Sequence, residues 1–301
     1  MRRPPPKSKT ESAMQRIEIV WLAIVGVLFA GQPRPATAED VEATQAACLQ
    51  VLLEGLASDQ FWPSMHAAEA LTMAGHGAEV IEALSKRLDT EEDDQHRCGL
   101  ARELFRAGNQ EVLGVFSQVL RSSDTHGHGH ACESLFKIGQ TGDKPLLMPY
   151  FTDDSQPIKQ LLAAAALANG DHPTAKQKIR ALIEAEEGNV AGIAAWILAV
   201  HGDASDIDRL RARRKQIESP KYRFFFTAAL AMQGDQDSID SLQKGLQAED
   251  PAIRGYAAEF CGRAGIQASR DALLDLLQDE DLDVRIRAAQ SLLLIDRSQG
   301  S

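Results

Sequence analysis

The ten residues His66-Ala-Ala-Glu-Ala-Leu-Thr-Met-Ala-Gly75 decide the fold, because their pattern recurs along the chain. An alanine pair, a leucine three or four residues later and a closing glycine describe a helix with a small-residue face. The glycine suits the left-handed conformation at a helix C-terminus. Such markers follow one another at intervals of 33, 31, 31, 32, 32, 31 and 31 residues: Gly75, Gly108, Gly139, Gly170, Gly202, Gly234, Gly265 and Asp296. A period this regular predicts a solenoid of stacked repeats.

Each period contains two helices. An alanine-rich helix precedes the marker, and a more polar helix with one apolar face follows it, as Ile81, Leu84 and Leu88 show. Two helices in one period form a helical hairpin, which cannot bury its apolar face alone and must stack on its neighbours. The sequence therefore predicts an all-α superhelix of about eight hairpins over residues 60–296. A capping helix at 39–59 precedes it and a tail at 297–301 follows.

The last two copies, Pro251-Ala-Ile-Arg-Gly-Tyr-Ala-Ala258 and Leu282-Asp-Val-Arg-Ile-Arg-Ala-Ala289, are the cleanest. Their D-x-x-V-R-x-x-A-A-x-x-L pattern resembles HEAT repeats, in particular the short phycobilisome-lyase HEAT-like type. The resemblance covers about residues 60–296 and is weakest in repeats four to six. It implies a right-handed, armadillo-type α-solenoid that serves as a binding scaffold, without implying lyase activity.

The resemblance also bears on individual residues. In that family an arginine ties neighbouring repeats together through a preceding aspartate, which implies this role for Asp250 and Asp281 in the last two copies. Deoxyhypusine hydroxylase is similar to this chain in repeat type, but it holds iron with adjacent His-Glu pairs. No His-Glu dipeptide occurs in this sequence, so that iron site is not carried over.

Residues 1–38 have the order of a secretory signal peptide. A basic region precedes an apolar run of 12 residues at 19–30, and Ala36-Thr37-Ala38 matches a cleavage site. The run is too short to span a membrane, so no transmembrane segment is expected in the mature form. Cleavage changes the net charge from −11 to −15, because six basic and two acidic residues are removed. We expect an exported bacterial protein, periplasmic or extracellular, that does not bind nucleic acid.

Four widely spaced cysteines remain after such cleavage: Cys48, Cys98, Cys132 and Cys261. Their apolar helical contexts favour free buried thiols over disulfides. A Cys98–Cys132 link between adjacent repeats is the pairing to test.

Alignment of the repeats singles out a polar set on the concave face. The position nine residues before the marker holds His66 and His130, and the position six before it holds Glu69, Arg102 and Glu133. One interpretation is a structural charge ladder Glu69–Arg102–Glu133 between stacked helices. The alternative is a metal-dependent or carbohydrate-active site on repeats one to three.

Alternating histidines sharpen the metal alternative. His126, His128 and His130 enter the helix that contains Glu133, and histidine with carboxylate at i, i+3 can bind a divalent metal. No HExxH, GxSxG or P-loop motif occurs, and no catalytic residue is assigned.

Repeats four to six are apolar all round over residues 161–167, 193–200 and 224–232. Ile193, Trp196 and Phe225 would form an apolar groove on the concave face, unless tight curvature simply buries them. Trp62 is expected to pack against the first helix. We therefore expect a non-enzymatic scaffold that binds a protein or peptide partner on its concave face.

Overall fold

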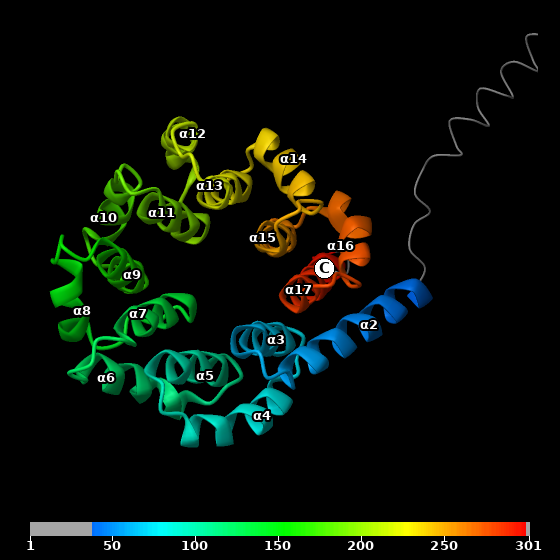
Figure 1. Cartoon of the computed structure of the whole chain (residues 1–301), viewed down its shortest axis with the longest axis horizontal. Coiled ribbons are helices and arrows are strands. Elements are labelled where there is room, and N and C mark those ends of the chain that lie inside the picture. Colours follow the sequence, from blue (N-terminus) through cyan, green and yellow to red (C-terminus); the bar gives the residue numbers. More distant parts are fainter. Residues whose placement is uncertain (1–37, 299–301) are drawn as a thin grey trace, which may run out of the picture. The chain divides into compact units, whose positions relative to one another are not determined.

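The computed structural model describes residues 38–298, so nearly all of the predicted signal peptide lies outside the described residues. The described residues from position 43 onward form one compact unit, and the architecture below is that of this unit. The described residues contain sixteen α-helices and no strand, which confirms the all-α prediction (Figure 1).

The helices alternate between an outer and an inner layer (Figure 1). The outer helices are α2 (Ala38–Leu56), α4 (Gly77–Thr90), α6 (Gly114–Arg121), α8 (Lys144–Phe151), α10 (Ala175–Leu182), α12 (Ile207–Arg214), α14 (Gln236–Gly245) and α16 (Arg270–Leu276). The inner helices are α3 (Phe61–Met73), α5 (Asp94–Arg106), α7 (His128–Lys137), α9 (Pro157–Ala168), α11 (Gly188–His201), α13 (Pro220–Met232), α15 (Pro251–Arg263) and α17 (Leu282–Ser298). Short 3-10 turns precede three of the outer helices: η1 (Gln110–Leu113), η2 (Ala204–Asp206) and η3 (Gln267–Ser269). The expected eight hairpins are all present, and the helix at the predicted cap, α2, is the outer member of the first one.

The solenoid closes into a ring, because the last inner helix packs against the first (Figure 1). At this seam Ile286 of α17 and Ala67 of α3 both lie against Gly55 of α2. A Cβ atom on Gly55 would come within 2.7 Å of the Ile286 side chain, so only glycine permits this approach. The repeat pattern predicts stacking of neighbours but does not predict that the eighth hairpin meets the first.

Five of the seven marker glycines end their helices as predicted, with positive φ angles: Gly75, Gly108, Gly139, Gly234 and Gly265. Gly170 and Gly202 differ. Asp171 takes the left-handed conformation beside Gly170 with φ of 56°, and Gly202 is extended with φ of −76°. Both exceptions lie in the repeats that fit the pattern least well.

Arginine does tie neighbouring repeats together, but through a different aspartate from the one expected. Arg254 donates from Nε to Asp279 at 2.8 Å, and Arg285 donates to the Asp279 carbonyl at 2.7 Å. Asp250 and Asp281 instead accept hydrogen bonds from backbone N–H groups of the helices that they begin. An aspartate at this position serves as an N-cap, which leaves Asp279 to pair with Arg254.

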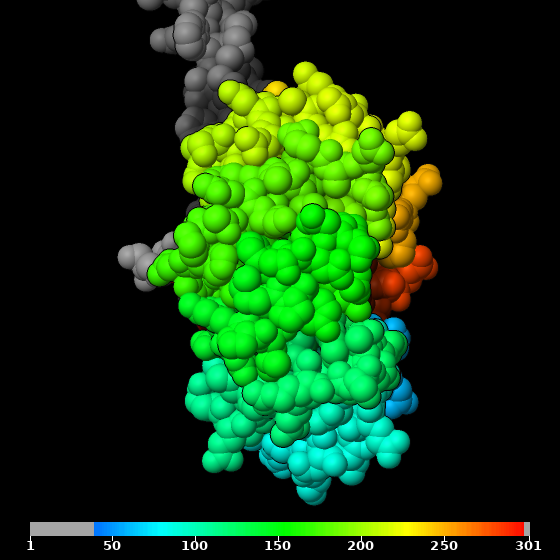
Figure 2. Space-filling view, turned by 90° about the vertical axis from the view of Figure 1, so that its left-hand side faces the viewer, coloured from blue at the N-terminus to red at the C-terminus, as the bar shows by residue number. Residues whose placement is uncertain are grey.

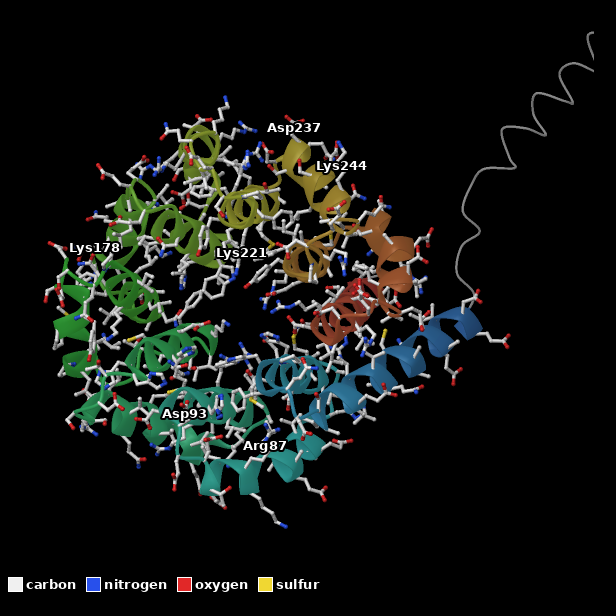
Figure 3. The ribbon with its side chains drawn as sticks, in the orientation of Figure 1. Arg87, Asp93, Lys178, Lys221, Asp237 and Lys244 are labelled. Atoms are coloured by element: carbon white, nitrogen blue, oxygen red, sulfur yellow. The ribbon has the colours of Figure 1, made fainter. Side chains whose placement is uncertain are left out.

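The core lies between the two layers, where Phe116, Phe226 and Phe260 are almost completely buried. The outer wall of the middle repeats is continuous in Figure 2. Charged side chains such as Lys178 and Lys244 stand on the outer circumference (Figure 3). Within the part of the chain that is described, no helix has the length and apolar character needed to cross a bilayer.

All four cysteines are buried, free thiols, and Cys98 and Cys132 are not linked. Burial raises the pKa of the Cys98 and Cys132 thiols to about 12.

Candidate functional site

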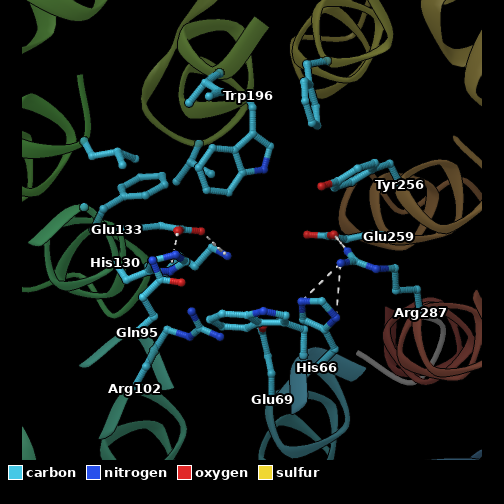
Figure 4. A pocket seen from close by; sticks show the side chains of 18 of the residues that line it. His66, Glu69, Gln95, Arg102, His130, Glu133, Trp196, Tyr256, Glu259 and Arg287 are labelled. Atoms are coloured by element: carbon cyan, nitrogen blue, oxygen red, sulfur yellow. Dashed lines mark hydrogen bonds and ion pairs between the residues drawn. The ribbon is translucent and has the colours of Figure 1, made fainter. Parts of the chain in front are cut away.

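A cavity of about 670 Å³ lies inside the ring, and all eight inner helices line it (Figure 4). Positions i, i+3 and i+7 of these helices share one face. The position nine before each marker contributes His66, His130, Ile193, Phe225, Tyr256 and Arg287. The position six before contributes Glu69, Arg102, Glu133, Trp196, Glu259 and Gln290, and the position two before adds Arg106, Lys137, Val200 and Arg263.

The lining divides into two sectors. We call the lining residues of α3, α5, α7, α15 and α17 the polar sector, since most of them are charged or hydrogen-bonding. The apolar sector consists of the apolar lining residues of α9, α11 and α13, beside which α9 also contributes Lys159: Ile158, Leu162, Ile193, Trp196, Val200 and Phe225. The polar set and the apolar groove that the sequence indicates as separate surfaces are thus two walls of one cavity.

Ion pairs connect the polar sector across the seam. Glu69 of α3 accepts from Arg106 at 2.9 Å and from Arg263 of α15 at 3.4 Å. Arg263 also pairs with Glu259 at 2.9 Å, and Glu259 pairs in turn with Arg287 of α17. Burial opposes ionisation of Glu69, but Arg106 and Arg263 outweigh it and hold its pKa far below the usual range. Glu259 likewise has a lowered pKa, since Arg287 and Arg263 overcome its burial.

His66 lies at the seam itself. Its Nδ1 is 2.5 Å from Asp283, and Nη2 of Arg287 is 3.3 Å from its Nε2 (Figure 4). Burial, reinforced by Arg287, lowers the pKa of His66, which keeps the imidazole neutral at pH 7. A neutral imidazole can donate from Nδ1 to Asp283, while Nη2 of Arg287 lies 3.3 Å from both ring nitrogens. His66 therefore joins the first and last repeats.

Glu133 and His130 of α7 form a second pair, 3.6 Å apart. Lys137 donates to Glu133 at 2.8 Å and also lies over the Trp196 ring, 5.2 Å from its centroid. Burial opposes the ionisation of Glu133, but Lys137 and Arg102 lower its pKa to about 2. Lys137 is therefore the side chain at which the two sectors meet.

Arg102 does not form the expected charge ladder. Its side chain is 3% exposed, and Nε donates to Glu103 of the same helix at 2.5 Å. Among the described residues, neither Glu69 nor Glu133 pairs with it, because each is already held by closer cations. Arg102 points from α5 toward the cavity with its terminal nitrogens unpaired among these residues (Figure 4).

The four residues of the metal alternative are not arranged around one point. His126, His130 and Glu133 all line the cavity, but His126 is half exposed and lies 3.4 Å from Asp93, whereas His130 pairs with Glu133. His128 is buried, and its Nδ1 contacts the Tyr150 hydroxyl. Within residues 38–298, no three His, Cys, Asp or Glu side chains come together as a metal site would require.

The HEAT-repeat family matches residues 81–168 and 214–293, which together make up more than half of the chain. This chain belongs to the HEAT-repeat family. None of the curated proteins matches its sequence.

Two solved structures illustrate what this HEAT-repeat protein is similar to. Human deoxyhypusine hydroxylase in complex with glycerol is 18% identical, with 88% of this chain and 100% of that chain covered and a TM-score of 0.43. An engineered protein is 17% identical, with 83% and 96% covered and a TM-score of 0.32.

Sequence reasoning missed several cavity residues of this HEAT-repeat protein. Trp62, expected against the first helix, lines the cavity and stacks on His130 with ring centroids 5.2 Å apart. Tyr256, Glu259 and Arg287 occupy the same repeat positions as His66 and Glu69, so their register could have revealed them. Their place beside His66 and Glu69 depends on ring closure, which brings repeats seven and eight next to repeat one.

Proposed function

We propose that this HEAT-repeat protein is an exported, non-enzymatic binding protein whose occupant lies inside the ring. The occupant is compact: a short segment of a protein or peptide partner, or a small molecule of similar size. The observation that carries the proposal is one cavity that presents a polar and an apolar wall to the same space.

The cavity volume supports a compact occupant. Ligand cavities typically measure about 300–1,000 Å³, and the space inside the ring is about 670 Å³. A folded partner domain is too large to enter such a space. The concave face, which in an open solenoid could dock a folded protein, here surrounds the occupant.

The apolar sector is the better anchor for binding. Trp196 and Phe225 are large, rigid side chains, and aromatic anchors of this kind contribute much of the energy at binding surfaces. Phe225 is fixed by edge contact with Tyr256, with ring centroids 4.8 Å apart. Both walls are therefore held in place before any occupant arrives.

Electrostatics favour binding over hydrolysis. A carbohydrate-cleaving site needs one carboxylic acid that is protonated near neutral pH. Arginine or lysine partners lower the pKa of all three lining glutamates, Glu69, Glu133 and Glu259. These carboxylates serve the structure of the wall and are not poised to donate a proton.

The experiment uses decanol as an uncharged apolar probe and follows tryptophan fluorescence, since Trp62 and Trp196 both line the cavity. We expect saturable binding that weakens about tenfold or more in Phe225→Ala, because a buried aromatic contact is lost. The control is Leu53→Ala, which removes an apolar side chain that is 47% exposed on α2. Unchanged binding in a folded Phe225→Ala variant would contradict the proposal.

Export is supported by the basic region, apolar run and Ala36-Thr37-Ala38 site in the sequence. Mass spectrometry of the protein recovered from the periplasm or medium should find Glu39 at its N-terminus. Recovery only from the cytoplasm with residues 1–38 intact would refute this part.

A further inference from the structure

The guanidinium of Arg102 is a charged group of the cavity wall that lacks a complete set of partners among the described residues. Nε is fixed by Glu103 at 2.5 Å, yet no described residue accepts a hydrogen bond from either terminal nitrogen. The residue is 98% buried, since its relative exposure is 2%, and it lines the cavity. Its terminal nitrogens open onto the cavity, where an occupant can accept their hydrogen bonds.

The other charged side chains of the polar sector indicate which sign of charge an occupant would need. Glu69 is shared by Arg106 and Arg263, Glu259 by Arg263 and Arg287, and Glu133 by Lys137 and His130, so each lining glutamate already has two basic neighbours. A cationic occupant would have to displace one of these neighbours.

One lysine adds to the positive side of this balance. Lys159 of α9 lines the cavity; its ammonium lies 5.8 Å from the Tyr150 ring centroid and helps to lower the pKa of Asp153. Six arginine and lysine side chains and three glutamates therefore line the cavity, in a chain whose net charge is −11.

We propose that the cavity binds an organic carboxylate, with its carboxylate on the terminal nitrogens of Arg102 and its apolar body against Trp196 and Phe225. This inference rests on the proposed function and specifies the chemistry of the occupant. The planar guanidinium matches a carboxylate with two parallel hydrogen bonds, and Glu103 holds the fork in orientation from behind.

Two sources supply this chemistry: the C-terminal carboxylate of a peptide with apolar last residues, and a free acid with an aliphatic or aromatic body. The shared requirement is a negative group at one end and an apolar portion at the other. Decanoate represents the free acid. A synthetic hexapeptide that ends in Leu-Phe, prepared with a free or an amidated C-terminus, represents the peptide.

The test titrates the full chain with decanoate, with decanol and with the two peptides, followed by tryptophan fluorescence and calorimetry. We expect decanoate or the free-acid peptide to bind about tenfold or more tightly than its uncharged counterpart. Arg102→Met should abolish that preference while it leaves decanol binding intact. Arg121→Met is the matched control, because Arg121 is an exposed residue of α6 that pairs with Asp143 outside the cavity.

The outcomes separate this inference from the proposed function. Preference for decanoate assigns the free acid, and preference for the free-acid peptide assigns a chain terminus; either supports the inference. Equal binding of decanoate and decanol, with no peptide preference, would overturn the carboxylate and leave the proposed function standing. If neither decanoate nor decanol nor either peptide binds, both fail. Should Arg102→Met misfold, Arg102→Lys retains the charge but not the fork and should reduce the preference without removing it.

Discussion

The polar and apolar sectors are built from the same helical hairpin, yet their inner faces are held in different ways. In the polar sector buried ion pairs link α3, α5, α15 and α17, and the pair between Glu69 and Arg263 crosses the seam between the first and last repeats. In the apolar sector, α9, α11 and α13 present side chains that need no specific partner. One sector closes the ring with directional contacts, and the other leaves an apolar wall available to an occupant.

The largest effect on stability is expected from a substitution of Arg287 in the polar sector. Arg287→Ala leaves Glu259 and Asp283 without their shared buried partner, and breaking such a pair typically costs about 3–5 kcal/mol. The expected result is a loss of that size in the free energy of unfolding, measured in urea. As a control, Arg121→Ala removes an exposed pair and should cost no more than about 1 kcal/mol. A loss below about 1 kcal/mol for Arg287→Ala would show that the seam does not depend on these charges.

A smaller effect is expected in the apolar sector. Trp196 is only partly buried at the cavity wall, so Trp196→Ala should cost about 2 kcal/mol, less than the roughly 3–5 kcal/mol typical of a fully buried aromatic residue. Phe226→Ala, at a fully buried position on α13, provides the comparison with the larger loss. Equal losses for the two variants would mean that Trp196 is part of the core and not of an open wall.

The apolar sector and the closure of the ring show what could and could not be predicted from the sequence. The repeat register correctly indicated that Ile193, Trp196 and Phe225 face inward together, because i, i+3 periodicity fixes which side of a helix a residue occupies. The closure of the ring could not be predicted from the periodicity. It depends on the total of the small rotations between successive hairpins, which the sequence of a single repeat does not indicate.

Charge pairing was equally hard to predict. The ladder Glu69–Arg102–Glu133 is expected because the three residues occupy the same position of successive repeats. Long basic side chains, however, can pair with any of several carboxylates within reach. Arg106 and Arg263 reach Glu69 from neighbouring helices, one of them across the seam. The sequence indicates the position of each residue along its helix, whereas the ion-pair partner of a side chain depends on how the helices pack.

A lower pH should reduce the stability of the protein through the polar sector. Of the three changes, this one should have the smallest effect. Burial lowers the pKa values of His66 and His130 below 6.5, so the unfolded chain binds protons more readily than the folded one. Their contribution to stability is present above pH 6.5 and is lost as the pH falls below it. The carboxylates with lowered pKa values, such as Glu69, add a second loss below about pH 4.5.

Urea unfolding midpoints at about pH 7 and pH 5 measure the first of these losses. The urea midpoint of the wild type should be lower at the acidic pH than at the neutral one. The decrease should be smaller in the double variant His66→Gln, His130→Gln. The same decline in both proteins would assign the pH dependence to other groups.

The central claim is that the two sectors face a single cavity, and the two tryptophans test it directly. Trp62 stacks on His130 in the polar sector, and Trp196 stands in the apolar sector. In a chain with Trp21→Phe, either Trp62 or Trp196 is also changed to phenylalanine, and each single-tryptophan protein is titrated with decanol. We predict that both tryptophans respond with the same midpoint. A response from Trp196 alone, with Trp62 silent, would contradict a shared cavity.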